Sequence, residues 1–139
     1  MRQISGYRLW LGHVGDVRDL SGLFSIGILA VVDLALNESM PALPRELVYC
    51  RFPLIDGSGN PRWLLRSAVG TVAGFLRSDT PTLVYCGAGM SRSPSIAGAA
   101  ISLVRGSRPE EGLTMASKSG PADISATLWT EVCAAVVEM

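Results

Sequence analysis

Residues 83–100, LVYCGAGMSRSPSIAGAA, place an apolar strand-like run, a short glycine-containing loop and a small-residue helix in direct succession. The strand is predicted to end at Cys86, and Gly87 and Gly89 allow the backbone of the loop to turn tightly. Arg92 stands where the helix begins, and a cation at a helix N-terminus opposes the helix dipole. The stretch therefore predicts a strand, a loop and a helix with a negatively charged group bound at their junction.

The rest of the chain is predicted to form a single α/β domain over residues 1–139. Short apolar runs alternate with helix-period patterns, which is typical of a mainly parallel sheet with helices on both faces. Strands are expected at 7–12, 28–35, 47–54 and 82–86. Helices are expected at 16–26, 61–77, 93–104, 109–118 and 123–138, the first and last with Asp16 and Asp123 as N-caps. Ligands of such sheets bind beyond the carboxyl ends of the strands, where the 83–92 stretch lies.

The charge balance restricts the classes of partner. The 139 residues include 12 basic and 12 acidic side chains, so the formal net charge is zero. Neither nucleic acid nor a membrane surface is therefore an expected partner, and anion binding has to be local. With 48% hydrophobic and 17% charged residues, the composition is that of a compact soluble domain rather than a disordered chain.

The cysteines and the apolar segments indicate the compartment. Cys50, Cys86 and Cys133 are odd in number and widely spaced, without a CxxC pair, which argues against a disulfide framework and against a zinc site. The N-terminal residues contain no apolar stretch long enough for a signal peptide. The run ILAVVDLAL contains Asp33 and is too short to span a bilayer. A reducing, cytoplasmic setting is expected.

The loop after Cys86 has the chemistry of a phosphate site. Successive backbone N–H groups in such a loop can converge on one anion, and the following helix adds free N–H groups and the positive end of its dipole. The planar guanidinium of Arg92 can bind two oxygens of the same phosphate, so a bound oxyanion explains its position. The expected phosphate-binding residues are Gly87, Ala88, Gly89, Met90, Ser91 and Arg92.

Cys86 stands at the start of this loop, where the positive field that holds a phosphate also stabilises a thiolate. Such a thiolate is a nucleophile aimed at phosphorus. We expect attack by Cys86, release of an alcohol or phenol, and hydrolysis of the resulting cysteinyl-phosphate by water. Ser93 is expected to donate a hydrogen bond to the sulfur in the second step or to cap the helix, and the two roles are compatible. The proposed chemistry needs no metal and no cofactor.

The run CGAGMSRS at 86–93 resembles the C-x5-R-[ST] phosphate loop of the cysteine-dependent protein tyrosine phosphatase superfamily. Its C-x-A-G-x-S-R-S form is similar to that of the dual-specificity phosphatase branch. The resemblance extends over most of the chain, through YRLWLG, ILAVVDLA, PLIDGSGN and PSIAGAA in the same order. It implies a protein tyrosine phosphatase-like fold and hydrolysis of phosphotyrosine or phosphoserine/threonine in proteins, or of a small phosphomonoester.

The same resemblance implies a general acid for the leaving oxygen. In this family an aspartate about 30 residues before the cysteine protonates the leaving group, and Asp56 in PLIDGSGN occupies that position. Gly57 and Gly59 would let this loop close, and Asn60 is a candidate for positioning it. Because Asp-Gly is also an ordinary turn signal, a purely structural role for Asp56 stays open.

Two residues depart from the family pattern. Tyr85 stands where the family usually has histidine, which predicts weaker stabilisation of the thiolate and a shifted pH optimum. Asp33 stands where the family often has asparagine, and a carboxylate there is acceptable only if it is hydrogen-bonded and away from the anion. The loop also lacks the lysines of phosphoinositide-directed relatives, which argues against inositol lipids as substrates.

Two other functions are compatible with the sequence. A phosphate- or phosphoprotein-binding pseudophosphatase without turnover would accommodate Tyr85. A rhodanese-like sulfurtransferase would also use a cysteine at the head of an anion-binding loop. The combination of Cys86 and Arg92 with Asp56 and Ser93 favours the phosphatase over both.

Several conspicuous residues receive structural interpretations. His13, the only histidine, is expected to be solvated or satisfied rather than catalytic. Cys50 is expected to pack on its strand rather than to pair with Cys86 as protection against oxidation. The tryptophans are expected in the core or lining a groove: Trp10, Trp63 and Trp129.

Overall fold

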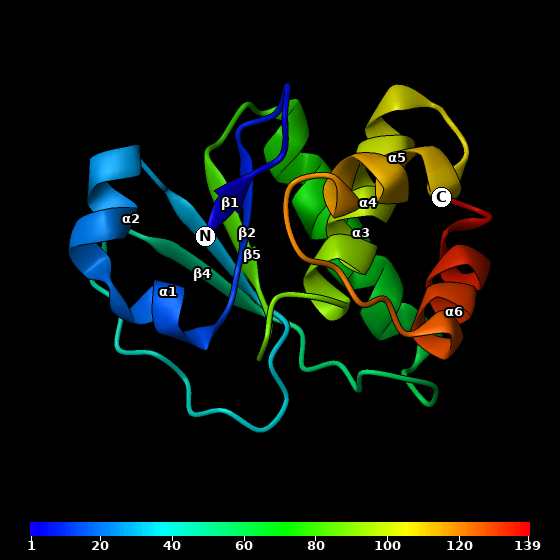
Figure 1. Ribbon diagram of the computed structural model, residues 1–139, viewed down its shortest axis with the longest axis horizontal. Helices are drawn as coiled ribbons and strands as arrows, with labels where there is room; N and C mark the ends of the chain where they lie inside the picture. The colour runs from blue at the N-terminus through cyan, green and yellow to red at the C-terminus, as the bar shows by residue number, and fades with distance from the viewer.

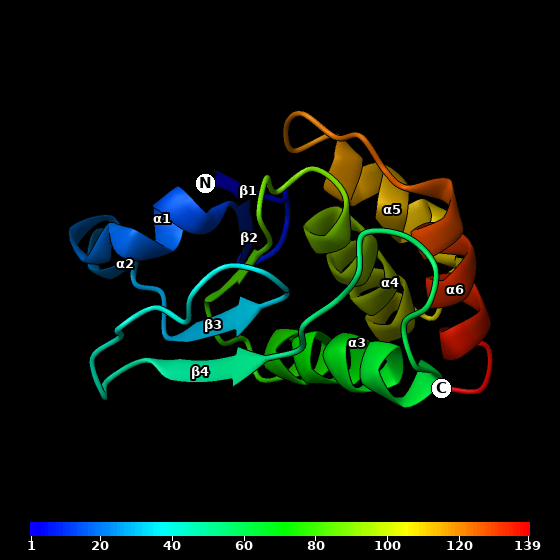
Figure 2. The same ribbon diagram turned by 90° about the horizontal axis from the view of Figure 1, so that it is seen from below.

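A computed structural model describes residues 1–139, which form a five-stranded sheet with helices on both faces (Figure 1). The strands are β1 (Arg2–Gln3), β2 (Leu9–Gly12), β3 (Ala30–Asp33), β4 (Val48–Arg51) and β5 (Thr82–Tyr85). The helices are α1 (Val14–Arg18), α2 (Leu20–Ile26), α3 (Arg62–Arg77), α4 (Arg92–Arg105), α5 (Pro109–Ser117) and α6 (Ala126–Val136). Figures 1 and 2 both show α1 and α2 on one side of the sheet and α3 to α6 on the other. None of the helices combines the length and the apolar composition that crossing a bilayer requires.

The sheet has the order β1-β2-β5-β3-β4, and β1 alone runs antiparallel to its neighbour. β5 lies in the middle, because Val84 pairs with Leu11 of β2 on one side and with Val32 of β3 on the other. All residues of β3 and β5 are buried, which explains their continuous apolar sequences. The predicted α/β class with a mainly parallel sheet is confirmed.

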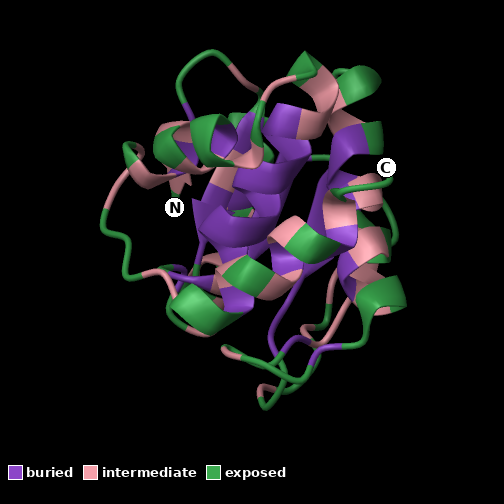
Figure 3. Ribbon diagram, turned by 90° about the vertical axis from the view of Figure 1, so that its right-hand side faces the viewer, coloured by how far each residue is buried: buried purple, intermediate pink, exposed green.

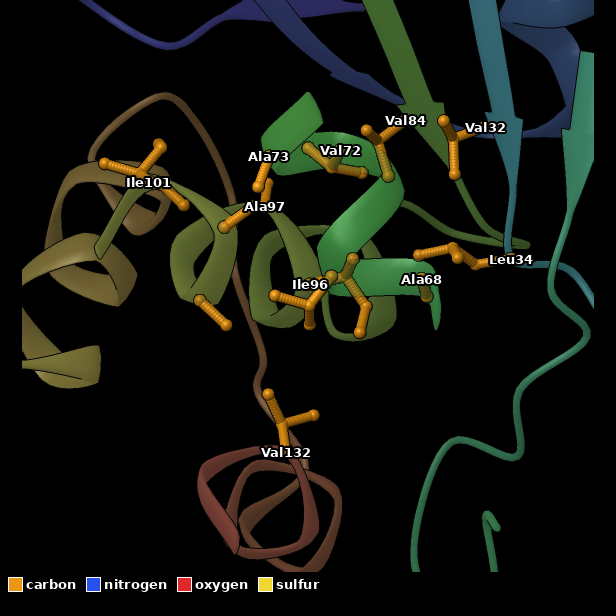
Figure 4. Packing of buried hydrophobic residues seen from close by; sticks show 14 of the residues in the cluster. Val32, Leu34, Ala68, Val72, Ala73, Val84, Ile96, Ala97, Ile101 and Val132 are labelled. Atoms are coloured by element: carbon orange, nitrogen blue, oxygen red, sulfur yellow. The ribbon is translucent and has the colours of Figure 1, made fainter. Parts of the chain in front are cut away.

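The side chains of the central strands alternate between two hydrophobic cores. Val32 and Val84 point toward α3 (Figure 4) and belong to the larger core, which α4 and α6 complete. Leu83 and Tyr85 point to the opposite face, where they join a smaller core under α1 and α2. Figure 3 shows the buried residues following the inner faces of the elements. The sheet is therefore covered on both sides, and only the ends of its strands remain open for a site.

α4 is the central helix of the larger core, and residues 93–102 are all buried. It crosses α5 at a pair of glycines. A Cβ on Gly112 would overlap the carbonyl group of Gly98, and a Cβ on Gly98 would lie 2.7 Å from Leu113 Cα. Because the packed backbones leave no room for even one methyl group, these two glycines set the distance between the helices.

The segment expected as one helix over 16–26 is instead two short helices. The imidazole of His13 caps α1, and Asp16 occupies the third helical position, where its carboxylate accepts from His13 N at 2.9 Å. Asp19 follows α1 and caps α2 through a 3.1 Å bond from Gly22 N. The expected N-cap at Asp16 is wrong, because His13 takes that position. The helix breaks at Asp19 because an aspartate favours a helix start over a helix interior.

Three further expectations need correction. α6 begins at Ala126 with Ser125 as its N-cap, so Asp123 does not cap it. β1 was not expected, since a two-residue strand leaves no periodic pattern. Trp63 is 66% exposed on the first turn of α3, whereas Trp10 and Trp129 pack against the cores as expected.

Candidate active site

The segment expected to bind phosphate forms a loop between the end of β5 and the start of α4. It rests on the end of β2, where Cys86 N donates to Gly12 O and Val14 N donates to Gly87 O, both at 3.4 Å. Gly89 has a φ of 74°, and a Cβ there would lie 2.6 Å from Gly12 O. Glycine is therefore required at 89, both for the left-handed backbone and for the close contact with β2.

Cys86 lies at the head of this loop with 2% of its surface exposed. Its Sγ accepts a hydrogen bond from Gly89 N at 3.2 Å. The sulfur is thus placed among the loop amides that are expected to bind the anion.

Ser93 is fully buried in the first turn of α4, and its Oγ has no hydrogen-bond partner. The alternative that Ser93 caps the helix is wrong, because the N-cap position belongs to Ser91 and no side chain caps α4. Ser91 Oγ instead accepts from Ser125 N at 2.9 Å. A buried hydroxyl without a partner is costly, and the bond from Ser93 to the sulfur of Cys86 stays a prediction.

The guanidinium of Arg92 turns back over the loop. One terminal nitrogen donates to Leu54 O at 3.1 Å, in the segment that leads from β4 to α3. The other lies 3.1 Å from where a Cβ on Gly87 would stand, and Glu38 from the β3–β4 segment approaches the same point to 2.8 Å. Gly87 therefore leaves room for both charged side chains beside the loop.

A cavity of about 90 Å³ opens over Cys86. Its lining residues are Asp56, Cys86, Ala88, Met90, Ser91, Arg92 and Asp123. The structure thus places Asp56 beside Cys86 and Arg92, while Gly87 and Gly89 shape the loop without lining the cavity. Four larger cavities, of about 230, 290, 320 and 510 Å³, lie elsewhere, and none of them is lined by a cysteine together with an aspartate or glutamate. The small cavity is therefore the candidate active site.

The loop that carries Asp56 is held in shape from two sides. The Asn60 side chain accepts from Ile55 N at 2.8 Å and donates to Ile55 O at 3.0 Å, which closes the loop on itself. The carboxylate of Glu131 on α6 accepts from Gly59 N at 2.8 Å and from Asn60 N at 3.1 Å. The bond from Gly59 N is the main cause that holds the pKa of Glu131 below its usual value. Sequence reasoning found Asn60 but missed Glu131, which stands far along the chain and in no motif.

Asp123 is a second carboxylate of the cavity, and sequence reasoning interpreted it as a helix cap. Its backbone N donates to Met90 O at 2.8 Å, so the segment before α6 packs directly on the phosphate loop. The side chain is exposed and lines the same cavity as Asp56. No pattern in the sequence relates this segment to the loop, because the contact arises only from the packing of α4 to α6.

Tyr85 and Asp33 form part of a polar cluster at the ends of β3, β4 and β5. The Tyr49 hydroxyl donates to Asp33 Oδ2, Ala35 N donates to Asp33 Oδ1 at 2.8 Å, and Arg51 Nε lies 3.8 Å from Oδ2. Burial raises the pKa of Tyr85, and the neighbouring Asp33 raises it further. Asp33 is therefore hydrogen-bonded and does not line the cavity, which is the condition under which a carboxylate is acceptable there.

Comparisons with known proteins extend this description. No family model and no curated protein matches the sequence. The fold matches human DUSP28 with a TM-score of 0.84 and 20% identity, over 97% of this chain and 94% of DUSP28. A mouse putative dual specificity phosphatase complexed with zinc tungstate matches with a TM-score of 0.83 and 20% identity, over 96% of this chain and 84% of that one.

The third matching structure is of a protein that is named as an interacting protein. The human tyrosine phosphatase-like serine/threonine/tyrosine-interacting protein matches with a TM-score of 0.81 and 19% identity, over 95% of this chain and 92% of that one. The expected protein tyrosine phosphatase-like architecture is thereby confirmed. The chain has the fold of the dual-specificity phosphatases.

Proposed function

We propose that residues 1–139 form one catalytic domain, a cysteine-dependent phosphatase that hydrolyses phosphomonoesters through a cysteinyl-phosphate intermediate. The observation that carries this proposal is the cavity in which Asp56 meets Cys86 and Arg92 at the end of the central strand. A nucleophile, an anion-binding cation and a proton donor are the three parts that the reaction needs.

In the first step, the phosphate group of the substrate binds to the loop amides and to the guanidinium of Arg92. Cys86 Sγ then forms a bond to phosphorus as the bond from phosphorus to the leaving oxygen breaks. Asp56 gives its proton to that oxygen, so an alcohol or phenol departs rather than an alkoxide or phenolate. The cysteinyl-phosphate and the Asp56 carboxylate remain.

In the second step, the same carboxylate takes a proton from a water molecule as the water oxygen attacks phosphorus. The bond between sulfur and phosphorus breaks, and inorganic phosphate and the Cys86 thiolate are released. The Ser93 hydroxyl donates a hydrogen bond to the departing sulfur, which would satisfy a buried polar atom that has no partner in the free protein.

Phosphotyrosine or phosphoserine/threonine in proteins is the substrate class that we favour. The mouse match holds tungstate, an oxyanion, and another match, PTPMT1, is in complex with PI(5)P. In this chain Arg92 is the single cation that lines the cavity, and two carboxylates lie beside it. Because Asp56 holds a proton when the substrate binds, Asp123 is the carboxylate that repels additional phosphate groups, which favours phosphoproteins over phosphorylated inositol lipids.

A second candidate function is phosphoprotein binding without turnover, and Tyr85 is the observation that favours it. The Tyr85 side chain packs into the smaller core beside Asp33, on the face of the sheet away from the cavity. Tyr85 therefore supplies no cation near Cys86, whereas the histidine of the family pattern would supply one. The two functions differ only in whether the bound phosphate is released by chemistry.

Hydrolysis of p-nitrophenyl phosphate by purified protein tests the proposal. The wild-type protein and a Cys133→Ser variant are expected to release nitrophenol equally, since Cys133 is a half-buried thiol on α6 that lies outside the cavity. Cys86→Ser is expected to abolish the reaction but to retain tungstate binding. EDTA is expected to have no effect.

Two other outcomes would each identify one of the alternative functions. Wild-type protein that binds tungstate but releases no nitrophenol is a binding module. Thiocyanate formation from thiosulfate and cyanide, dependent on Cys86, would identify a sulfurtransferase instead.

A further inference from the structure

Arg2 on β1 contacts the phosphate loop but is not among the residues that line the cavity. One of its terminal nitrogens donates to Gly89 O at 2.8 Å and to Pro121 O at 3.1 Å, and its Nε donates to Ser119 Oγ at 3.1 Å. The side chain is partly buried and connects two segments that are far apart in the sequence. It does not line the cavity, so it does not touch a bound substrate.

The space for Arg2 is provided by the segment before α6. A Cβ on Gly120 would overlap Arg2 Cδ and would lie 2.7 Å from Arg2 Nε. The backbone of Arg2 is itself held by the antiparallel pairing of β1 with β2, in which Arg2 stands opposite Leu11. β2 also supports the loop at Gly12. The position of Arg2 relative to the loop is therefore fixed both at its backbone, through β2, and at its guanidinium.

The contact of Arg2 with Gly89 O bears on the orientation of the peptide group between Gly89 and Met90. The carbonyl of Gly89 and the N–H of Met90 belong to the same planar trans peptide, so they point in opposite directions. The carbonyl of Gly89 points toward Arg2, so the N–H of Met90, a residue that lines the cavity, points away from Arg2. Glycine turns more freely than any other residue, so without such an external contact this peptide can rotate.

The same residue adds positive charge behind the nucleophile. Burial lowers the pKa of Arg2, and the neighbouring charges of Cys86 and Asp16 act in the opposite direction. Arg2 is therefore close enough to Cys86 for the charge of its guanidinium to act on the sulfur.

We propose that Arg2 is a positioning residue of the phosphate site, which holds the Gly89–Met90 peptide so that its N–H is directed at the bound oxyanion. This inference rests on the proposed function only in that the oxyanion is the phosphate of a substrate. Oxyanion binding itself can be measured without turnover. Arg2 acts through the backbone of the loop and takes no part in proton transfer or bond formation.

Tungstate titration and p-nitrophenyl phosphate kinetics of three Arg2 variants test this role. Arg2→Gln is expected to weaken tungstate binding about tenfold or more, which is the size of one lost charge-assisted hydrogen bond, and to lower kcat with little change in the stability against urea. Arg2→Lys keeps the charge but cannot bind two acceptors in one plane, so it is expected to recover only part of the affinity. Free methylguanidinium is expected to restore kcat partly in Arg2→Ala.

Arg8→Gln is the matched control, because Arg8 also donates to a carbonyl, that of Asp79 at 3.2 Å, but on the surface and outside the cavity. It is expected to behave as wild type. Wild-type affinity for tungstate in folded Arg2→Gln would overturn the proposal, and so would full recovery in Arg2→Lys, which would leave only a charge effect. If Arg2→Gln does not fold, the lysine variant alone decides between these outcomes. Wild-type protein that binds tungstate without turnover contradicts the phosphatase function but still permits this test.

Discussion

The Tyr49 hydroxyl on β4 donates a hydrogen bond to the buried carboxylate of Asp33 on β3. The pairing of Asp33 with Arg51 and with Tyr85 places this contact at the carboxyl ends of three neighbouring strands. A carboxylate taken out of water is stable only if donors replace the lost water molecules. The tyrosine is therefore part of what allows a charged residue at this position of the sheet.

Tyr49→Phe is expected to destabilise the protein by about 1.5–3 kcal/mol, because the carboxylate of Asp33 loses a donor and water has little access to replace it. Tyr7→Phe is a matched control, since the Tyr7 hydroxyl meets only the exposed Arg105 at 3.4 Å, and its effect should stay within about 0.5 kcal/mol. Urea unfolding measures both. Equal midpoints for the two variants would show that Asp33 does not depend on Tyr49.

The two carboxylates of the cavity can be separated by matched substitutions. Asp56→Asn is expected to lower kcat for free phosphotyrosine by about 10²–10⁴, because its phenolic leaving group needs a proton in the transition state. Asp123→Asn is expected to change kcat by less than about threefold, because we assign proton transfer to Asp56 alone. Steady-state kinetics of both variants test the assignment. A large loss in Asp123→Asn with little loss in Asp56→Asn would transfer the role of general acid to Asp123.

The contact of Glu131 with the Asp56 loop is expected to depend on pH. The pKa of Glu131 is lowered in the folded protein by the bonds from Gly59 N and Asn60 N. The stabilisation of the loop is therefore fully present above the ordinary glutamate pKa and is lost as the pH falls through the lowered value. Hydrogen-exchange protection of the Gly59 and Asn60 amides should decrease accordingly when the pH is lowered below the ordinary value of 4.5.

Two glutamate variants control this experiment. Glu131→Ala should remove both the protection and its pH dependence, because no acceptor remains. Glu138→Ala, beyond the end of α6, should leave both unchanged. Protection of Gly59 in Glu131→Ala that equals the wild-type value would mean that Asn60 alone orders the loop.

Substitution of glycine by alanine is expected to have opposite effects on stability at two helical sites, one at the crossing of α4 and α5 and one on α3. Gly112→Ala is expected to destabilise the protein by about 3 kcal/mol, because its Cβ would lie 2.9 Å from the carbonyl carbon of Gly98 in a packed interface. Gly74→Ala on α3 meets nothing within 4 Å, and should stabilise the protein by roughly 0.5–1 kcal/mol through a better helix propensity. Thermal and urea unfolding measure both changes, and a neutral Gly112→Ala would show that the helices can separate freely.

The central elements of the fold could be predicted because their sequences report burial directly. Continuous apolar runs identified β3 and β5, and helical spacing of apolar residues identified α3 and α4. The break at Asp19 was missed because an aspartate can lie within a helix pattern as well as between two helices. β1 was missed because only its pairing with Trp10 and Leu11 makes it a strand, and pairing leaves no trace in two residues.

The residues of the candidate site also differ in whether the local sequence or only the tertiary packing reveals them. Cys86 and Arg92 lie within one short loop, so their relation could be inferred from local sequence. Asp56 required the resemblance to a family, since its spacing alone has no physical meaning. Arg2, Asp123 and Glu131 reach the loops of the site only through tertiary packing, and no local pattern in the sequence relates any of them to the site.

β5 is the last strand in the sequence and the middle strand of the sheet. β2 and β3 both pair with Thr82–Tyr85, and neither pairs with the other. Until β5 docks, the chain therefore carries two open strand edges that can recruit other chains, and closing them requires contacts between distant residues, which form slowly. The strand that leads to Cys86 is also the one that closes the sheet, so protection from aggregation and the proposed active-site loop arise in the same folding step.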